Sequence, residues 1–397
     1  MTDMVIDKPK LLWQLQFEGA WPMAVTFLDS GRRLVAGNQA GQLLMWDLPA
    51  EPPPFEPPKN KERLAPSAPP VRRLDGHENG VTRLVATPDG RWIVSASLDH
   101  SVRIWDMHAD PTGEAEVIVD LETRQAEAKR SKKDDALNQP GVSVKTQQAT
   151  HQFVGHQDWI EALGINDEGT RVISGDNHGH VFVWNLAERK QVGHWQGRPW
   201  NWIVAAALSP DGQTALVSEH RYKRDDFDVP TAALKLWNVA DATETLDLLK
   251  IQFPKLMPDD TSYGGSQLWR KFIANGLIAV DFSPDGKFLA LGQGGETDKG
   301  QIHLLDATTG MLVRTISGHQ YGVTDLQFSS DGKYVVSTGR DTTLRITQVE
   351  DGKEVAALGT PRGGQFKDWL SSLAIAPDQK TVAATDIAGL VHVWALS

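Results

Sequence analysis

Runs of alternating apolar and polar residues recur along the chain, separated by turn-forming segments rich in aspartate and glycine. Typical runs are WIVSAS (92–97), RVISGD (171–176), FLALGQ (288–293) and YVVSTG (334–339). A period of two places the Val, Ile and Leu side chains on one face, as in half-buried β-strands. Other runs end in tryptophan, as in SVRIWDM (101–107) and HVFVWNL (180–186). The hydrophobic pattern therefore predicts an all-β protein of many short strands.

One turn phrase divides the chain into seven units. Its copies are LDSGR (28–32), TPDGR (87–91), NDEGT (166–170), SPDGQ (209–213), SPDGK (283–287), SSDGK (329–333) and APDQK (376–380). Asp-Gly allows a positive φ at low cost, so the chain can reverse between two strands. The glycines of the third and fourth copies are 43 residues apart, and those of the fifth and sixth are 46 apart. These spacings are close to the ~40–45 residues of a four-stranded propeller blade.

The fullest repeat combines several motifs that belong together in one known family. Residues 76–106 contain Gly76-His77, Pro88-Asp89-Gly90, Ser95, Asp99 and Trp105-Asp106. This pattern resembles the WD40 repeat, and the resemblance extends over most of the chain. Seven repeats imply a single seven-bladed β-propeller of four-stranded antiparallel blades. The expected repeats are about 18–70, 71–150, 151–192, 193–254, 270–313, 314–358, and 359–397 plus 10–17.

The two ends of the chain predict how the ring closes. LVHVWALS (390–397) reads as the third strand of a blade, and no residues follow for a fourth. KLLWQLQF (10–17) has the pattern of the missing outer strand. We expect it to complete the last blade, which would close the ring and remove open sheet edges.

A histidine, a serine and an aspartate in the same repeat invite a catalytic interpretation. A catalytic triad needs an exposed hydroxyl and an oxyanion hole. The resemblance implies instead that these positions, with a tryptophan, form a buried hydrogen-bonded network. Several repeats keep only part of this set, which suits redundant structural contacts better than an active site. The expected network residues are His77, Ser95, Asp99 and Trp105; His156, Ser174 and Trp184, with His178 in the aspartate position; and His319, Ser337 and Asp341. Repeats one and seven have alanines at both small positions.

Insertions interrupt the repeats at four places, 49–70, 108–150, 219–233 and 254–272. The first is proline-rich and is expected to be an extended, solvated linker, or alternatively a ligand for a proline-recognition domain. The second is charged, and it reads as a mobile loop or an anchoring patch. AEVIVDL (115–121) and HQFVG (151–155) compete for the role of outer strand beside it. The last two are expected on the top face, which carries the Gly-His turns, and they supply Arg221, Tyr222, Arg224, Trp269 and Arg270 as candidate binding residues.

Four tryptophans share one position in the repeat, ten residues before the turn glycine. They are Trp21, Trp159, Trp202 and Trp369, and the other three repeats have glycine there. The resemblance places this position at the top mouth of the central channel. Tryptophan is enriched at binding hot spots, so these side chains, with Glu161 nearby, are candidates for binding a peptide that carries apolar and basic side chains. Packing of each indole against its own blade is the alternative.

Composition narrows the function further. The formal charge of −11 argues against nucleic acid or an anionic membrane as the main partner. The sequence has no cysteine, which rules out disulfides, Cys-ligated zinc and a cysteine nucleophile. It shows no signal-peptide pattern and no long apolar run, so a cytoplasmic protein without a membrane span is expected. His178-Gly179-His180 offers two candidate metal ligands without an evident third, and no nucleotide or protease motif is present. We therefore expect no cofactor and a non-catalytic scaffold for a protein or peptide, with a small-molecule receptor and a propeller enzyme as alternatives.

Overall fold

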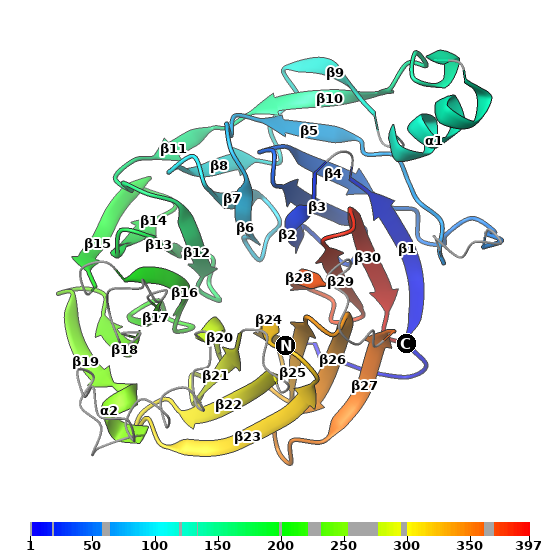
Figure 1. Ribbon diagram of the computed structural model, residues 1–397. Coiled ribbons are helices and arrows are strands. Elements are labelled where there is room, and N and C mark those ends of the chain that lie inside the picture. The colour runs from blue at the N-terminus through cyan, green and yellow to red at the C-terminus, as the bar shows by residue number, and fades with distance from the viewer. Residues whose placement is uncertain are drawn as a thin grey trace, which may run out of the picture.

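Seven sheets surround a common centre in the computed structural model, each radiating outward as one blade of a ring (Figure 1). The structure describes residues 2–17, 20–57, 64–118, 121–132, 134–197, 201–220, 232–252, 277–294, 300–360 and 369–397. Each blade has four antiparallel strands, which confirms the predicted seven-bladed, all-β architecture. We call the end of the ring that carries the Asp-Gly turns the bottom, and the opposite end the top.

The strands of each blade are given from the ring centre outward. Blade 1 has β2 (Pro22–Phe27), β3 (Arg33–Asn38), β4 (Leu43–Asp47) and β5 (Arg72–Asp75). Blade 2 has β6 (Val81–Ala86), β7 (Trp92–Ser97), β8 (Val102–Asp106) and β11 (His151–Phe153). Blade 3 has β12 (Ile160–Ile165), β13 (Arg171–Asp176), β14 (His180–Asn185) and β15 (Lys190–Gln196). Blade 4 has β16 (Trp202–Leu208), β17 (Thr214–His220), β18 (Ala232–Asn238) and β19 (Thr243–Asp247), followed by the short helix α2 (Leu248–Gln252). Blade 5 has β20 (Leu277–Phe282), β21 (Phe288–Gln293), β22 (Gly300–Asp306) and β23 (Leu312–His319). Blade 6 has β24 (Val323–Phe328), β25 (Tyr334–Gly339), β26 (Thr343–Gln348) and β27 (Glu354–Gly359). Blade 7 has β28 (Leu370–Ile375), β29 (Thr381–Asp386), β30 (Leu390–Ala395) and β1 (Lys10–Gln16).

The N-terminal strand closes the ring as predicted. β1 pairs antiparallel with β30 and buries Trp13, Leu15 and Phe17 almost completely. The segment before β1 continues across the bottom of blade 7, where the Asp7 N–H donates to Leu396 O at 2.8 Å and Met4 is buried. The two ends of the chain therefore hold the same blade together.

The second insertion adds two strands to blade 1. β9 (Gly113–Val117) and β10 (Val142–Gln148) form a hairpin, and β10 pairs with β5 in parallel. α1 (Leu121–Ser131) and a short 3₁₀ turn (Asp134–Ala136) lie between these strands at the rim of the ring (Figure 1). The outer strand of blade 2 is β11, so HQFVG takes the role that AEVIVDL also fitted. Because β10 leads directly into β11, this strand joins the outer parts of blades 1 and 2.

The end of the proline-rich insertion packs against the ring instead of extending into solvent. The Gln14 side chain accepts hydrogen bonds from the N–H groups of Leu64 and Ala65, and the Trp46 indole donates to Ala68 O at 3.1 Å. Ala65 is buried. The prediction of a solvated linker is therefore wrong for these residues, because buried side chains of β1 and β4 bind their backbone.

A β-bulge occurs where the outer strand pairs with its neighbour in blades 3 to 7. The extra residue is Val192 in blade 3, Val313 in blade 5 and Val355 in blade 6. These valines are among the most exposed large apolar side chains of the described residues. A bulge bends an edge strand and interrupts its regular ladder. Their exposure thus has a local structural cause.

Candidate interaction surface

The position shared by the four tryptophans is structurally equivalent in the repeats that the structure describes. The carbonyls of Trp21, Trp159 and Trp369 accept backbone N–H groups of Gln39, Asn177 and Ile387 at 2.9, 2.9 and 3.0 Å. Gly80 O and Gly322 O accept the corresponding bonds in blades 2 and 6. Each bond joins the residue before the inner strand to the turn at the top of the same blade. The backbone is thus fixed alike, whether the residue is tryptophan or glycine.

The tryptophans differ sharply in exposure. Trp21 is 52% exposed and Trp159 is 48% exposed, whereas Trp202 and Trp369 are half-buried. The Arg340 guanidinium lies 4.4 Å above the centre of the Trp369 indole, in a cation–π contact. Both residues lie on the top face of the propeller. By contrast, the strand tryptophans Trp46 and Trp105 have no exposed surface. Two large apolar groups are therefore presented to solvent at the top of the ring.

Close packing explains the glycine in blade 2. A Cβ atom on Gly80 would lie 3.0 Å from Gln39 O, which belongs to the top turn of blade 1. Such a contact is tighter than an ordinary van der Waals contact, so a larger residue would have to displace this turn. Glycine here reflects the approach of the neighbouring blade, and it leaves a gap in the row of bulky residues.

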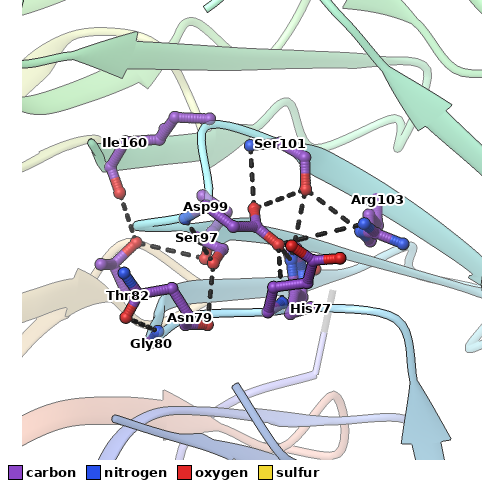
Figure 2. Close-up of polar contacts among 12 residues, drawn as sticks. His77, Asn79, Gly80, Thr82, Ser97, Asp99, Ser101, Arg103 and Ile160 are labelled. Carbon is purple, nitrogen blue, oxygen red and sulfur yellow. Dashed lines mark hydrogen bonds and ion pairs between the residues drawn. The ribbon is translucent and has the colours of Figure 1, made fainter. Parts of the chain in front are cut away.

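Every inner strand contains a bulge, at the second residue in six blades and at the third residue, Val204, in blade 4. In three blades the side chain at the bulge contacts the next blade. The hydroxyls of Thr82, Thr324 and Ser371 donate to the first carbonyl of the next inner strand, at 2.5, 2.6 and 3.2 Å. The Thr82 bond to Ile160 O is drawn in Figure 2. Neighbouring blades are thus joined near the ring centre.

Glu161 occupies the same bulge position in blade 3 and is half-buried. Burial raises the pKa of its carboxyl above the usual value, although Arg83 and a hydrogen bond with Asn177 act in the opposite direction. The structure therefore places Glu161 below Trp159, toward the inner strands. The Glu161 carboxyl therefore lies closer to the ring centre than to the top mouth of the channel.

Two other carboxylates at the ring centre were not predicted from the sequence. Asp281 accepts the N–H groups of Phe282 at 2.9 Å and Phe328 at 2.8 Å, and Asp325 accepts the Leu373 N–H at 2.9 Å. The innermost strand of each blade is an edge strand, so the N–H groups on its unpaired side need acceptors from elsewhere. The available signal was a charged residue within an inner strand, as in LIAVDF and VTDLQF. These carboxylates connect blades 5, 6 and 7.

Asp281 should make stability depend on pH near neutrality. Burial, with smaller contributions from Asp167 and Asp325, raises the pKa of Asp281 to about 7. The folded protein thus retains a proton that the unfolded chain releases, so the contribution of Asp281 to stability falls as pH rises from 3.8 toward 7. We expect the urea unfolding free energy to decline between pH 5 and 8, and to decline less in Asp281→Asn. An equal decline in both proteins would contradict the assignment; Asp351→Asn, at an exposed turn, is the control.

The predicted histidine networks are present in blades 2, 3 and 6. In blade 2, His77 Nδ1 lies 2.8 Å from Asp99 Oδ2, and its Nε2 lies 2.5 Å from Ser95 Oγ (Figure 2 shows the Asp99 contact). In blade 6, His319 makes the same contacts with Asp341 at 2.9 Å and Ser337 at 2.8 Å. The three hydroxyl-bearing serines, Ser95, Ser174 and Ser337, are buried. These networks therefore hold turns to strands.

Blade 3 corrects the sequence alignment. Asp176, and not His178, binds His156 Nδ1, at 2.9 Å, while Ser174 Oγ lies 2.7 Å from Nε2 and accepts the Trp184 indole at 2.8 Å. Asp176 lies two residues closer to the serine than Asp99 or Asp341 does in its own repeat. Its Oδ1 also accepts the N–H groups of His178 and His180. The aspartate at the end of the strand can thus serve both the turn and the histidine.

The indole contact is not uniform among the networks. Trp105 Nε1 is buried and has no hydrogen-bond partner within the described part of the chain, whereas Trp184 Nε1 binds Ser174. In blade 7, His392 Nε2 lies 2.7 Å from Asp386 Oδ2 although the serine position is Ala384. This histidine belongs to strand β30 and not to the turn before the inner strand, so the contact differs from the networks of blades 2, 3 and 6.

The turn histidines of blade 3 lie in a row. The His178 and His180 rings are stacked with centroids 5.8 Å apart, and His180 Nδ1 lies 3.2 Å from His194 Nε2. Burial and the charge of His180 lower the pKa of His194. Over the described ranges no group of three or more His, Asp or Glu residues is suited to hold a metal ion.

The candidate loop residues Arg221, Tyr222, Arg224, Trp269 and Arg270 lie outside the described residues. They remain predictions. Of the expected surface, the described residues include Trp21, Trp159, Glu161, Trp202 and Trp369.

Comparison with known proteins agrees with this architecture. The model of the WD domain, G-beta repeat, matches residues 68–106, 147–185 and 310–347. Autophagy-related protein 16 from Arabidopsis thaliana is 35% identical over 329 residues, which cover 82% of this chain and 50% of that protein. WD repeat-containing protein SL1-17 from Schistosoma mansoni is 25% identical over 206 residues, covering 52% and 56% of the two chains. Target of rapamycin complex subunit wat1 from Schizosaccharomyces pombe is 24% identical over 153 residues, covering 36% and 48%.

The chain spans about half the length of these relatives. Separately, no helix among the described residues is both long and apolar enough to cross a membrane.

Proposed function

Because the chain is a seven-bladed β-propeller of the WD40-repeat family, we propose that it is a non-catalytic scaffold that binds a protein or peptide on the top surface of the ring. The exposure of Trp21 and Trp159 at equivalent positions carries this proposal. About half of each indole remains in contact with water, whereas Trp46 and Trp105 in the strands are fully buried. Tryptophan contributes a large apolar area at a small entropic cost on binding.

The arrangement of the ring favours a partner that contacts several blades. Trp21 and Trp369 belong to the neighbouring blades 1 and 7, Arg340 of blade 6 contacts Trp369, and Trp159 precedes the inner strand of blade 3. Glu161, Asp281 and Asp325 supply three carboxyl groups at the ring centre beneath them. Burial raises the pKa of each, and a cation placed beside them would favour their ionised forms. A peptide with apolar side chains for the rim and a basic side chain directed toward the centre would match this distribution.

The relatives support a binding role. One of them is named as a subunit of the target of rapamycin complex, so a protein with a similar repeat region takes part in a multi-subunit assembly. We propose a comparable role in a cytoplasmic complex for this chain, without nucleic acid or a cofactor as ligand.

Replacing the two exposed tryptophans tests the proposal. We expect Trp21→Ala/Trp159→Ala to lose the partners that the wild type captures from its native lysate, because the two most exposed indoles of the proposed surface are removed. A matched variant, Met311→Ala/Val313→Ala, removes two comparably exposed apolar side chains at the start of the outer strand of blade 5. Quantitative mass spectrometry of both captures, with thermal unfolding of each protein as a folding check, measures the difference. Equal capture by the two variants would contradict the top-surface assignment.

A further inference from the structure

A second candidate site lies on the bottom of the ring, at the junction of blades 4 and 5. At two of the bottom junctions, 7–1 and 3–4, the residue two positions after the turn position of one blade meets the turn glycine of the next. In blade 7 this residue is Thr381, and a Cβ on Gly31 of blade 1 would lie 2.5 Å from its hydroxyl. In blade 3 it is Arg171, and in blade 4 it is Thr214.

Arg171 shows which chemistry this kind of junction accepts. Its Nη1 donates to Gly212 O at 2.8 Å and lies 3.4 Å from the Gln213 side-chain oxygen. Its aliphatic carbons cover the turn, since a Cβ on Gly212 would lie 2.9 Å from Arg171 Cδ. Asp211 in the same turn has a pKa below its usual value through hydrogen bonds with Ser209 and Gln213, with a further contribution from the Arg171 charge. A guanidinium thus binds a turn carbonyl beside a carboxylate.

The junction of blades 4 and 5 has the same acceptors without the arginine. The two turns have one geometry, because the Gly212 and Gly286 N–H groups each donate to a serine carbonyl at 2.8 Å with φ values of 67° and 70°. Gly286 is the counterpart of Gly212, and Asp285 is the counterpart of Asp211. In place of a long side chain, the short Thr214 lines a cavity of about 410 Å³ together with Asp211, Asp285, Gly286 and Phe282.

We propose that this cavity binds the arginine side chain of a partner protein, held as Arg171 is held at the preceding junction. The guanidinium would donate to Gly286 O and lie beside the Asp285 carboxylate, with its aliphatic carbons against the turn. A planar group with several fixed donors can serve the carbonyl and the carboxylate together, which a lysine ammonium does less well. Lys287 Nζ now lies 2.8 Å from Asp285, but this exposed pair is weak and can be displaced.

Saturation-transfer difference NMR with the full chain tests this site, because the method detects weak binding of small probes. The probes are N-acetyl-arginine methylamide, its neutral citrulline analogue, the lysine analogue and free arginine. We expect saturable binding of the arginine amide and at least tenfold weaker binding of the citrulline analogue. The lysine analogue should bind with an affinity between these two. Equal binding of the citrulline analogue would overturn the guanidinium assignment. Tighter binding of free arginine than of its amide would overturn the assignment to a protein partner.

Two substitutions locate the binding. Thr214→Arg should fill the cavity from within and remove the signal, with an unchanged or higher melting temperature showing that the protein is folded. Arg171→Thr should open a second junction of the same kind and add a second class of sites. An undiminished signal in folded Thr214→Arg would place the binding elsewhere and overturn the proposal. If Thr214→Arg does not fold, loss of binding in Asp285→Asn supports the site, and unchanged binding overturns it.

Discussion

Deletion of residues 1–17 should abolish cooperative folding of the ring. The deletion removes β1, and with it the buried side chains of Trp13, Leu15 and Phe17 and the outer strand of blade 7. Burying one large apolar side chain stabilises a fold by roughly 1.5–3 kcal/mol, and domains are stable by only about 5–15 kcal/mol in total. Blade 7 would also expose β30 as an unprotected edge. Differential scanning calorimetry and the soluble yield measure the outcome.

A peptide spanning residues 1–17 provides the control for this deletion. Added to the truncated protein during refolding, it should restore a melting transition, because it supplies the missing strand and binds only the folded ring. A peptide with Leu15→Asp should fail, since it places a charge in the core. A truncated protein that melts like the wild type would show that the ring closes without β1.

Asp341→Ala should be the most destabilising single substitution among the turn aspartates. Asp341 is buried and binds His319 at 2.9 Å, the Gln320 N–H at 2.9 Å and the Thr343 hydroxyl at 2.7 Å. Its removal leaves the buried His319 ring without its partner. Breaking a buried, hydrogen-bonded pair typically costs about 3–5 kcal/mol. Urea unfolding at pH 7 measures the loss, and Asp351→Ala, at an exposed turn, should cost less than about 1 kcal/mol.

The pH dependence of this effect has a definite sign. Burial alone would raise the pKa of the Asp341 carboxyl. The hydrogen bond with His319 and the charge of His319 nevertheless hold this pKa below its usual value of 3.8. The stabilisation is therefore fully present above that value and is lost as pH falls below it. The difference between wild type and Asp341→Ala should shrink in acid. A difference that stays constant down to pH 2 would contradict the ionised pairing.

Most of the fold could be predicted from the sequence because each blade contains the same local turn and strand patterns. The Asp-Gly turns and the period-two strands specify four strands per unit, and LVHVWALS with KLLWQLQF specifies the closing blade. In addition, the His-Ser-Asp spacing of blades 2 and 6 is local, so a shared motif was sufficient to identify both networks.

Features that depend on backbone irregularities were harder to predict. Asp176 was overlooked because the alignment assumed one spacing, whereas an aspartate two residues earlier reaches His156 equally well. Glu161 was expected at the rim, but the bulge of the inner strand places it toward Arg83. The parallel pairing of β10 with β5 joins segments separated by a long insertion, and no local sequence pattern identifies which strand β10 pairs with. Exposure of Trp21 and Trp159 likewise depends on neighbouring blades, which a single repeat does not describe.

The outer-strand bulges decide where the ring can grow. The outer pairings of blades 1 and 2 have no bulge, and blade 1 carries the two additional strands, whereas the interrupted ladders of blades 3 to 7 offer no regular template. A hairpin grafted beside β15 or β27 should therefore fail to pair, and one that replaces β9 and β10 should succeed. For engineering purposes, the outer edge of blade 1 is the attachment point at which new modules can be fused away from the top and the bottom of the ring.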